Sequence, residues 1–104
     1  MSAVEGAWDV RIKTPIGTLS TTYEFVSAGD RLRGSATSKD ETVELRDIAV
    51  VDEGDGQRVT WRQSVTRPMR LHLSFDVVVD GDRMTGHSRA GRLPRSAVAG
   101  VRRR

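Results

Sequence analysis

The sequence predicts an all-β protein: one eight-stranded antiparallel up-and-down barrel with an internal two-fold sequence repeat. Apolar and polar residues alternate with a period of two through most of the chain, and no segment shows helical periodicity. Turn signals rich in Gly, Pro and Asp separate these runs at even spacing. The length of 104 residues suits a single domain, residues 1–104. A seven-stranded sandwich is the alternative fold.

The repeat is carried by two stretches that share Gly-Asp-Arg-(Leu/Met)-x-Gly, namely Phe25–Gly34 and Phe75–Gly86. Each follows a tryptophan and a proline-marked turn: Trp8 with Pro15, and Trp61 with Pro68. The period of roughly 50 residues predicts two similar four-stranded units rather than a long array.

The alternation also gives the bounds of the strands. We expect them at Ala7–Lys13, Thr18–Ser27, Arg31–Ser38, Thr42–Val51, Arg58–Val65, Met69–Val79, Arg83–Arg89 and Ser96–Val101. Asp47 interrupts the alternation of the fourth strand, which predicts a β-bulge there.

The turns predict which inward side chains face each other. The expected pairs are Phe25 with Gly34, Phe75 with Gly86, Trp8 with Phe25, and Trp61 with Phe75. Strands one and five run in the same direction in a meander, so both tryptophan rows are expected to fill the same end of the barrel.

The opposite end is expected to carry polar side chains on its inner face: Thr21, Ser38, Gln63 and Ser88, with Tyr23 midway. Polar groups inside a small barrel must hydrogen-bond to one another, to water or to a ligand. A self-satisfied polar interior and a ligand pocket therefore both remain open. In the second interpretation a small, largely apolar ligand contacts Val10, Leu19, Thr21, Tyr23, Ser38, Gln63, Leu71, Leu73 and Ser88. Replacing Gln63 with Leu or Tyr23 with Phe is then expected to spare the fold and to weaken binding.

Gly6-Ala7-Trp8 opens the first of the alternating strands, and this pattern resembles the calycin group, which comprises lipocalins, fatty-acid-binding proteins and avidins. In lipocalins a Gly-x-Trp closes the barrel floor, so the resemblance implies a lipocalin-like barrel closed at Trp8. Family members mostly bind small apolar molecules, and some barrels of this general kind are isomerases or cyclases. The chain is much shorter than a lipocalin, lacks the terminal helix, and lacks the avidin contacts to biotin.

An isomerase or cyclase that uses the same pocket is the alternative function, with Tyr23 and Asp47 as candidate catalytic residues. The strand parity can turn the Asp47 carboxylate inward, where burial would raise its pKa and suit it to proton transfer. The Tyr23 phenol can hydrogen-bond a carbonyl or an enolate. The competing interpretations are an outward bulge at Asp47 and a packed Tyr23 ring.

No metal site or cofactor is expected from the sequence. The chain has no cysteine, and His72 and His87 both fall on outward positions without a clear third ligand. The acidic run Asp52–Gly56 lacks the spacing of a calcium loop. No phosphate loop or dinucleotide-binding fingerprint is present.

Charge is divided unevenly along the chain. Residues 1–55 carry six basic and eleven acidic residues, a net −5, whereas residues 56–104 carry eleven basic and three acidic residues, a net +8. A solvated surface with a basic tail accounts for this division. A homodimer that pairs the acidic half with the basic half also accounts for it. Anion or nucleic-acid binding is a third possibility, but the exposed faces lack an aromatic stripe for base stacking.

The chain is expected to be cytoplasmic and not to associate with membranes. The opening residues lack the charged and apolar blocks of a signal peptide, and no apolar run approaches the length of a membrane span. The absence of cysteine agrees with a reducing compartment.

Overall fold

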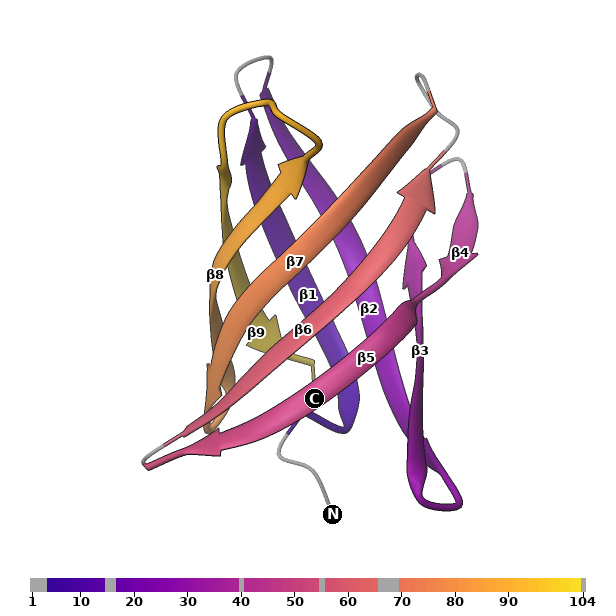
Figure 1. Cartoon of the computed structure of the whole chain (residues 1–104), viewed down its shortest axis with the longest axis vertical. Coiled ribbons are helices and arrows are strands. Elements are labelled where there is room, and N and C mark those ends of the chain that lie inside the picture. Colours follow the sequence, from indigo (N-terminus) through magenta and orange to yellow (C-terminus); the bar gives the residue numbers. More distant parts are fainter. Residues whose placement is uncertain (1–3, 15–16, 40, 55, 66–69, 104) are drawn as a thin grey trace.

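In the computed structural model, the described part of the chain forms nine antiparallel strands in one continuous sheet that curls into a nearly closed barrel (Figure 1). The structure describes residues 4–14, 17–39, 41–54, 56–65 and 70–103. The strands are β1 (Gly6–Thr14), β2 (Gly17–Ala28), β3 (Arg31–Thr37), β4 (Thr42–Glu44), β5 (Arg46–Glu53), β6 (Gly56–Val65), β7 (Leu71–Asp80), β8 (Arg83–Ala90) and β9 (Ser96–Arg102). This confirms the predicted all-β barrel, with nine strands rather than eight.

The strand order explains the closure. The sheet runs β4-β3-β2-β1-β9-β8-β7-β6-β5, so the first and last strands of the chain are neighbours. Trp8 lies opposite Arg102, and the pairing of β1 with β9 continues to Lys13 and Ala97. The two outermost strands, β4 and β5, follow each other directly in the chain. The sheet therefore bends round until its edges meet at one corner.

That corner corrects the predicted fourth strand, because Thr42–Val51 divides into β4 and β5. Asp47 has a φ of 55°, in the left-handed region that few residues other than glycine adopt. Leu45 turns into the core, and its backbone N–H donates to the Gly34 carbonyl over 2.9 Å. The irregularity was predicted at the correct residue. It is a corner at which the chain stops pairing with β3, as β4, and begins to pair with β6, as β5. The register of β5 with β6 shifts between Arg46 and Ala49.

Two hairpins turn at Gly29-Asp30 and Gly81-Asp82, where both glycines have positive φ angles, 69° and 61°. The first turn confirms the predicted pairing of Phe25 with Gly34. The predicted pairing of Phe75 with Gly86 is wrong, because the second turn begins one residue later than expected. Phe75 faces Ser88, and Gly86 faces Val77.

The first tryptophan row is also shifted. Trp61 faces Phe75 as predicted, but Trp8 faces Tyr23, and Phe25 faces Gly6. The hairpin of β1 and β2 pairs Thr14 with Gly17 and so has a shorter connection than expected. A shift of two residues keeps every side chain on its own face of the sheet, so the predicted inward residues of β1 and β2 keep their face.

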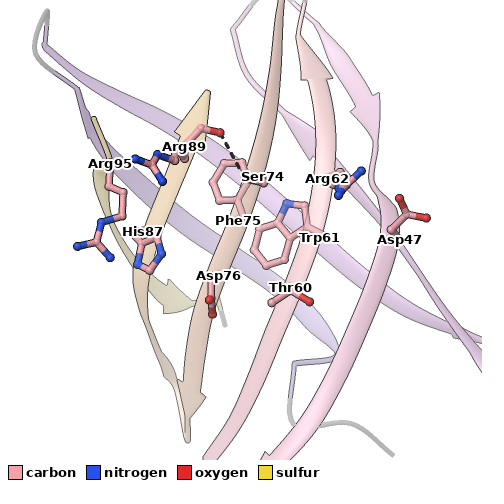
Figure 2. Close-up of a pocket in the computed structure, with 10 residues that line it drawn as sticks. All are labelled: Asp47, Thr60, Trp61, Arg62, Ser74, Phe75, Asp76, His87, Arg89 and Arg95. Carbon is pink, nitrogen blue, oxygen red and sulfur yellow. Dashed lines mark hydrogen bonds between the residues drawn. The ribbon is translucent and has the colours of Figure 1, made fainter. Parts of the chain in front are cut away.

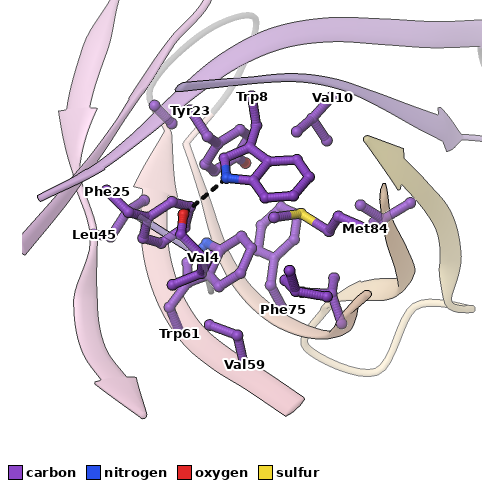
Figure 3. Close-up of a cluster of buried hydrophobic side chains, with 14 of the residues drawn as sticks. Val4, Trp8, Val10, Tyr23, Phe25, Leu45, Val59, Trp61, Phe75 and Met84 are labelled. Carbon is purple, nitrogen blue, oxygen red and sulfur yellow. Dashed lines mark hydrogen bonds between the residues drawn. The ribbon is translucent and has the colours of Figure 1, made fainter. Parts of the chain in front are cut away.

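Large aromatic side chains pack against one another inside the barrel (Figure 3). Trp61 stacks on Phe75 with ring centroids 4.9 Å apart, and Phe25 meets Trp61 edge-on at 5.4 Å. The Trp8 indole N–H donates to the Val4 carbonyl over 2.8 Å, and Val4 itself is buried. Both tryptophans therefore belong to one buried cluster.

Candidate functional site

Gln63 is the polar side chain around which the upper interior is arranged. By upper interior we mean the part of the barrel toward the end where β1 joins β2 and β6 joins β7. It lies on β6 opposite Leu73, and only 3% of the residue is exposed. Its Oε1 accepts one hydrogen bond from the Tyr23 hydroxyl, at 2.8 Å, and another from the Trp61 indole N–H, at 3.0 Å. An indole nitrogen can only donate, so the atom that it contacts must be the carboxamide oxygen. The orientation of the Gln63 amide is thereby fixed, with its NH₂ group directed elsewhere.

Two polar groups in this interior have no partner among the described residues. The Gln63 NH₂ group and the Ser88 hydroxyl form no hydrogen bond with any described residue, although Ser88 is only 4% exposed. Among the described residues, no completely buried side-chain nitrogen or oxygen lacks a partner. These two atoms must therefore reach space open to water. A nearly buried donor facing such space is suited to a ligand or a bound water.

Aliphatic side chains lie beyond Gln63, toward one end of the barrel. At this end, the top of Figure 1, β1 joins β2 and β6 joins β7. Leu19 faces Ile12 on the inner side of the sheet, yet 52% of it is exposed. Thr21, Leu71 and Leu73 are half-buried. The floor beneath them is the row in which Trp61 faces Phe75 and Phe75 faces Ser88. The upper interior is thus a partly exposed apolar region above an aromatic floor.

The remaining predicted ligand contacts divide into two groups. Val10 and Tyr23 are buried in the core, so a ligand in the upper interior meets them only across other side chains. Ser38 does not line the interior, because β3 ends at Thr37 and Ser38 is exposed in the following connection. Its hydroxyl donates to the Glu41 carbonyl over 3.4 Å. The sequence also suggests that a ligand would enter past residues 66–69, which lie outside the described part of the chain.

The two candidate catalytic residues lie as the competing interpretations expect, with Tyr23 packed in the core and Asp47 exposed. Burial raises the pKa of Tyr23 well above its ordinary value. The hydrogen bond to Gln63 lowers this pKa, but by less than burial raises it. The Tyr23 phenol thus stays protonated through the neutral range. Asp47 is exposed at the corner between β4 and β5 and lines a hollow on the outside of the sheet. Asp47 therefore brings no carboxylate to the interior, and the Tyr23 phenol serves there as a hydrogen-bond donor to Gln63.

The structure has two hollows that the sequence did not predict. A pocket of about 880 Å³ lies over β6, β7 and β8, where Arg62, Ser74 and Arg89 line it with His87 and Arg95 (Figure 2). A second hollow, of about 700 Å³, lies between Ser27–Leu32 and the start of β5. Alternation reveals which side chains point outward, but it does not reveal where the twisted sheet makes that surface concave.

Histidines and carboxylates do not assemble a metal centre in the part of the chain that the structure describes. The Nδ1 atom of His72 lies 2.8 Å from the Ser64 hydroxyl on the outer surface, and His87 lies at the 880 Å³ pocket. The described residues also contain no helix of a length and apolarity that would cross a membrane.

Comparisons of the chain with protein-family models, with curated proteins and with solved structures find no match. Its function must therefore be argued from the site geometry.

Proposed function

We propose that the barrel binds a small, largely apolar molecule at the end where β1 joins β2 and β6 joins β7. The observation that supports this most directly is the Gln63 carboxamide. Tyr23 and Trp61 fix its oxygen, and its NH₂ group reaches accessible space in an otherwise largely buried setting. Such a group provides orientation and specificity within an apolar site. Ligand binding in the interior is also what the resemblance to calycins implies.

The chemistry of the lining defines the ligand further. Leu19, Leu71 and Leu73 offer aliphatic surface to an apolar body. Gln63 offers a neutral donor, so the polar group of the ligand is an acceptor such as a carbonyl, ether or hydroxyl oxygen. A charged group next to Gln63 would lose its hydration without gaining an opposite charge, which is costly in a buried setting.

Binding is favoured over catalysis as the role of this region. The enzyme alternative requires an ionisable group facing the ligand, and the Tyr23 phenol stays protonated while donating to Gln63. Asp47 is exposed on the other side of the sheet. An isomerase or cyclase would have to act here by confining a reactive substrate, without general acid–base chemistry.

The experiment is native mass spectrometry of the full chain purified from its own host, to detect a retained small molecule. Ser88→Ala and Gln63→Glu are the informative variants. Ser88→Ala removes the Ser88 hydroxyl, and Gln63→Glu replaces the NH₂ group with an oxygen. Both variants keep an acceptor at position 63 for Tyr23 and Trp61. Loss of the bound mass in Gln63→Glu, with Thr85→Ala on the outer face unchanged, would support the proposal. A wild-type protein that carries no molecule and takes up no apolar probe such as an anilinonaphthalene dye would refute it.

We also propose that the chain forms a homodimer. The support is the division of charge between residues 1–55 and residues 56–104, which lets two copies pair acidic with basic surface twice across a two-fold axis. The exposed valines Val51 and Val78 add apolar surface on β5 and β7. A dimer held in this way would weaken as salt screens the charges.

A further inference from the structure

Three outward side chains stand in one row across β6, β7 and β8. Arg62 lies opposite Ser74, and Ser74 lies opposite Arg89. The row extends to β5, where Arg46 lies opposite Arg62. The Cα atoms of directly opposed residues are about 5 Å apart. The Cα atoms of Arg62 and Arg89, on either side of Ser74, therefore lie roughly 10 Å from each other. Figure 2 shows the two arginines on either side of Ser74.

The row lies in the pocket of about 880 Å³, which Arg95 and His87 border on the β8–β9 side (Figure 2). Pockets of this size hold drug-sized or nucleotide-sized ligands. Trp61 and Phe75 contribute to the same pocket, but their rings belong to the buried core. The surface presented to a ligand is therefore polar and basic.

The cations of this pocket are largely unneutralised. Arg62 and Arg95 form no hydrogen bond or ion pair with any described residue. Arg89 uses its Nε to donate to the Leu93 carbonyl over 3.2 Å, which leaves its two terminal nitrogens as donors. Like charges placed close together on one face of a sheet destabilise it. An anion bound between Arg62 and Arg89 would relieve that repulsion.

The two carboxylates of the pocket do not supply this anion. Asp76 is held by Arg58, which donates to it from both Nε and Nη2. This hydrogen bonding lowers the pKa of Asp76, and the positive charge of Arg58 acts in the same direction. Asp47 lies at the β5 rim and forms no ion pair with a described arginine. Its carboxylate is available as an acceptor for ligand hydroxyls.

We propose that this pocket binds a phosphate monoester of a small polyhydroxy molecule. The phosphate dianion sits over the Ser74 hydroxyl between the Arg62 and Arg89 guanidinium groups, with Arg95 adding charge from the β8–β9 side. Arginine presents two parallel N–H donors that match the oxygens of phosphate. The Ser74 hydroxyl donates to the Arg89 carbonyl over a long 3.5 Å, and it would exchange this bond for one to the phosphate. The hydroxyls of the ligand lie toward Asp47 and Thr60. This site is on the outside of the sheet and does not depend on the interior site.

A nucleic-acid strand fits the pocket less well than a small phosphate. Stacking platforms for bases are aromatic side chains, and those at this pocket are turned into the core. Asp47 at the rim would also repel a polyanion that continues past the pocket. Recognition here is therefore of a single phosphate with neutral hydroxyls attached.

The test is isothermal titration of the full chain with ribose 5-phosphate at low salt, with ribose and inorganic phosphate as separate probes. We expect ribose 5-phosphate to bind more tightly than phosphate, and ribose not to bind. Arg62→Gln with Arg89→Gln should weaken binding on the order of tenfold to a hundredfold, because hydrogen bonds to charged groups are lost. Ser74→Asp, which places a carboxylate in the same spot, should have a similar effect.

Arg83→Gln is the matched control, because Arg83 is an exposed arginine on β8 near the Gly81-Asp82 turn. It should leave the affinity within twofold, a change small on the scale of a single charged contact. Equal losses in the control and the double variant would show diffuse electrostatic attraction and overturn the proposal. Failure of ribose 5-phosphate to bind, or tighter binding of a short single-stranded DNA with the same dependence on Arg62 and Arg89, would overturn it as well.

Discussion

The Tyr23 hydroxyl donates to Gln63 Oε1 over 2.8 Å, and this bond joins β2 to β6 across the barrel between residues 40 positions apart. Trp61 donates to the same oxygen from two residues away on β6. One acceptor thus satisfies two buried donors, one from β2 and one from β6, which face each other across the barrel. Gln63 is therefore part of the core as well as of the candidate site.

This relationship changes the expected outcome of Gln63→Leu. The sequence alone predicts that the substitution spares the fold. In the structure it leaves the Tyr23 hydroxyl and the Trp61 N–H without an acceptor in a buried setting. Each unsatisfied donor costs about 1–3 kcal/mol, so we expect a loss of about 2–6 kcal/mol in the free energy of unfolding, measured by urea denaturation.

Tyr23→Phe is the control for that loss. It removes one donor and leaves Gln63 Oε1 bonded to Trp61, so about 1 kcal/mol is expected. If Gln63→Leu and Tyr23→Phe destabilised the protein equally, Gln63 could not be accepting both hydrogen bonds.

Trp61→Ala should be among the most destabilising substitutions in the chain. It deletes a buried ring stacked on Phe75 at 4.9 Å and leaves a cavity, with an expected loss of about 3–5 kcal/mol. Trp61→Phe preserves part of the stacking and should cost less. Chemical denaturation of both variants checks this order, and the reverse order would show that the core does not depend on the stack.

Gly86 and Gly34 occupy matching places after their turns, yet we expect different responses to alanine. A Cβ at Gly86 would lie 2.2 Å from the Asp76 carbonyl oxygen and 2.6 Å from the Val77 Cα, and backbone atoms cannot easily move. At Gly34 the nearest atom is the Leu45 Cδ1, at 2.8 Å, which a rotamer change can displace. Gly86→Ala should therefore destabilise by about 1–3 kcal/mol or more, and Gly34→Ala by less.

Thermal unfolding of the two alanine variants measures this difference. Equal midpoints would mean that the approach of β8 to β7 at Gly86 is looser than the structure has it.

The sequence predicted the inward faces of the strands better than their registers. Period-two alternation places Val59, Trp61 and Gln63 on one face of β6 without reference to any neighbour, and all three are buried. The pairing of Trp8 with Tyr23 depends instead on the length of the β1–β2 connection. The pairing of Phe75 with Ser88 depends on which residue begins the turn between β7 and β8. A run of Asp, Gly and Asp allows more than one such beginning, so these errors of two residues were not detectable from the pattern.

The candidate sites required information that no single strand contains. The bond of Gln63 to Tyr23 and Trp61 depends on the curvature that brings β2 and β6 across from each other. The row of Arg62, Ser74 and Arg89 depends on the registers of two strand pairs. Each arginine alone is an ordinary outward residue, and only the alignment and the concave surface make them a site.

The state of association should depend on ionic strength if the two halves of the chain pair between copies. We expect a dimer in sedimentation velocity at low salt and a shift toward monomer at high salt, because surface charges about 10 Å apart are screened at 0.1 M. A monomer at high protein concentration and low ionic strength would refute the dimer. Reversing one of the acidic charges in residues 1–55 should weaken the dimer. In that variant, added salt should shift the dimer–monomer equilibrium less than it does in the wild type.

Tyr23 is the only tyrosine of the chain, so its ionisation can be followed directly by ultraviolet absorbance of tyrosinate. Burial raises the pKa of Tyr23 in the folded protein above the value of about 10 that an unfolded chain shows. The stability that this difference represents is fully present below pH 10 and is lost as the pH rises beyond it, because the unfolded chain then releases a proton that the folded protein retains. We expect native protein to show no tyrosinate near pH 10, and alkaline unfolding to coincide with its formation. In Tyr23→Phe this contribution to the loss of stability above pH 10 should disappear. A folded protein that formed tyrosinate with a midpoint near pH 10 would show that Tyr23 is exposed to water, and the hydrogen bond that orients Gln63 would then be lost with it.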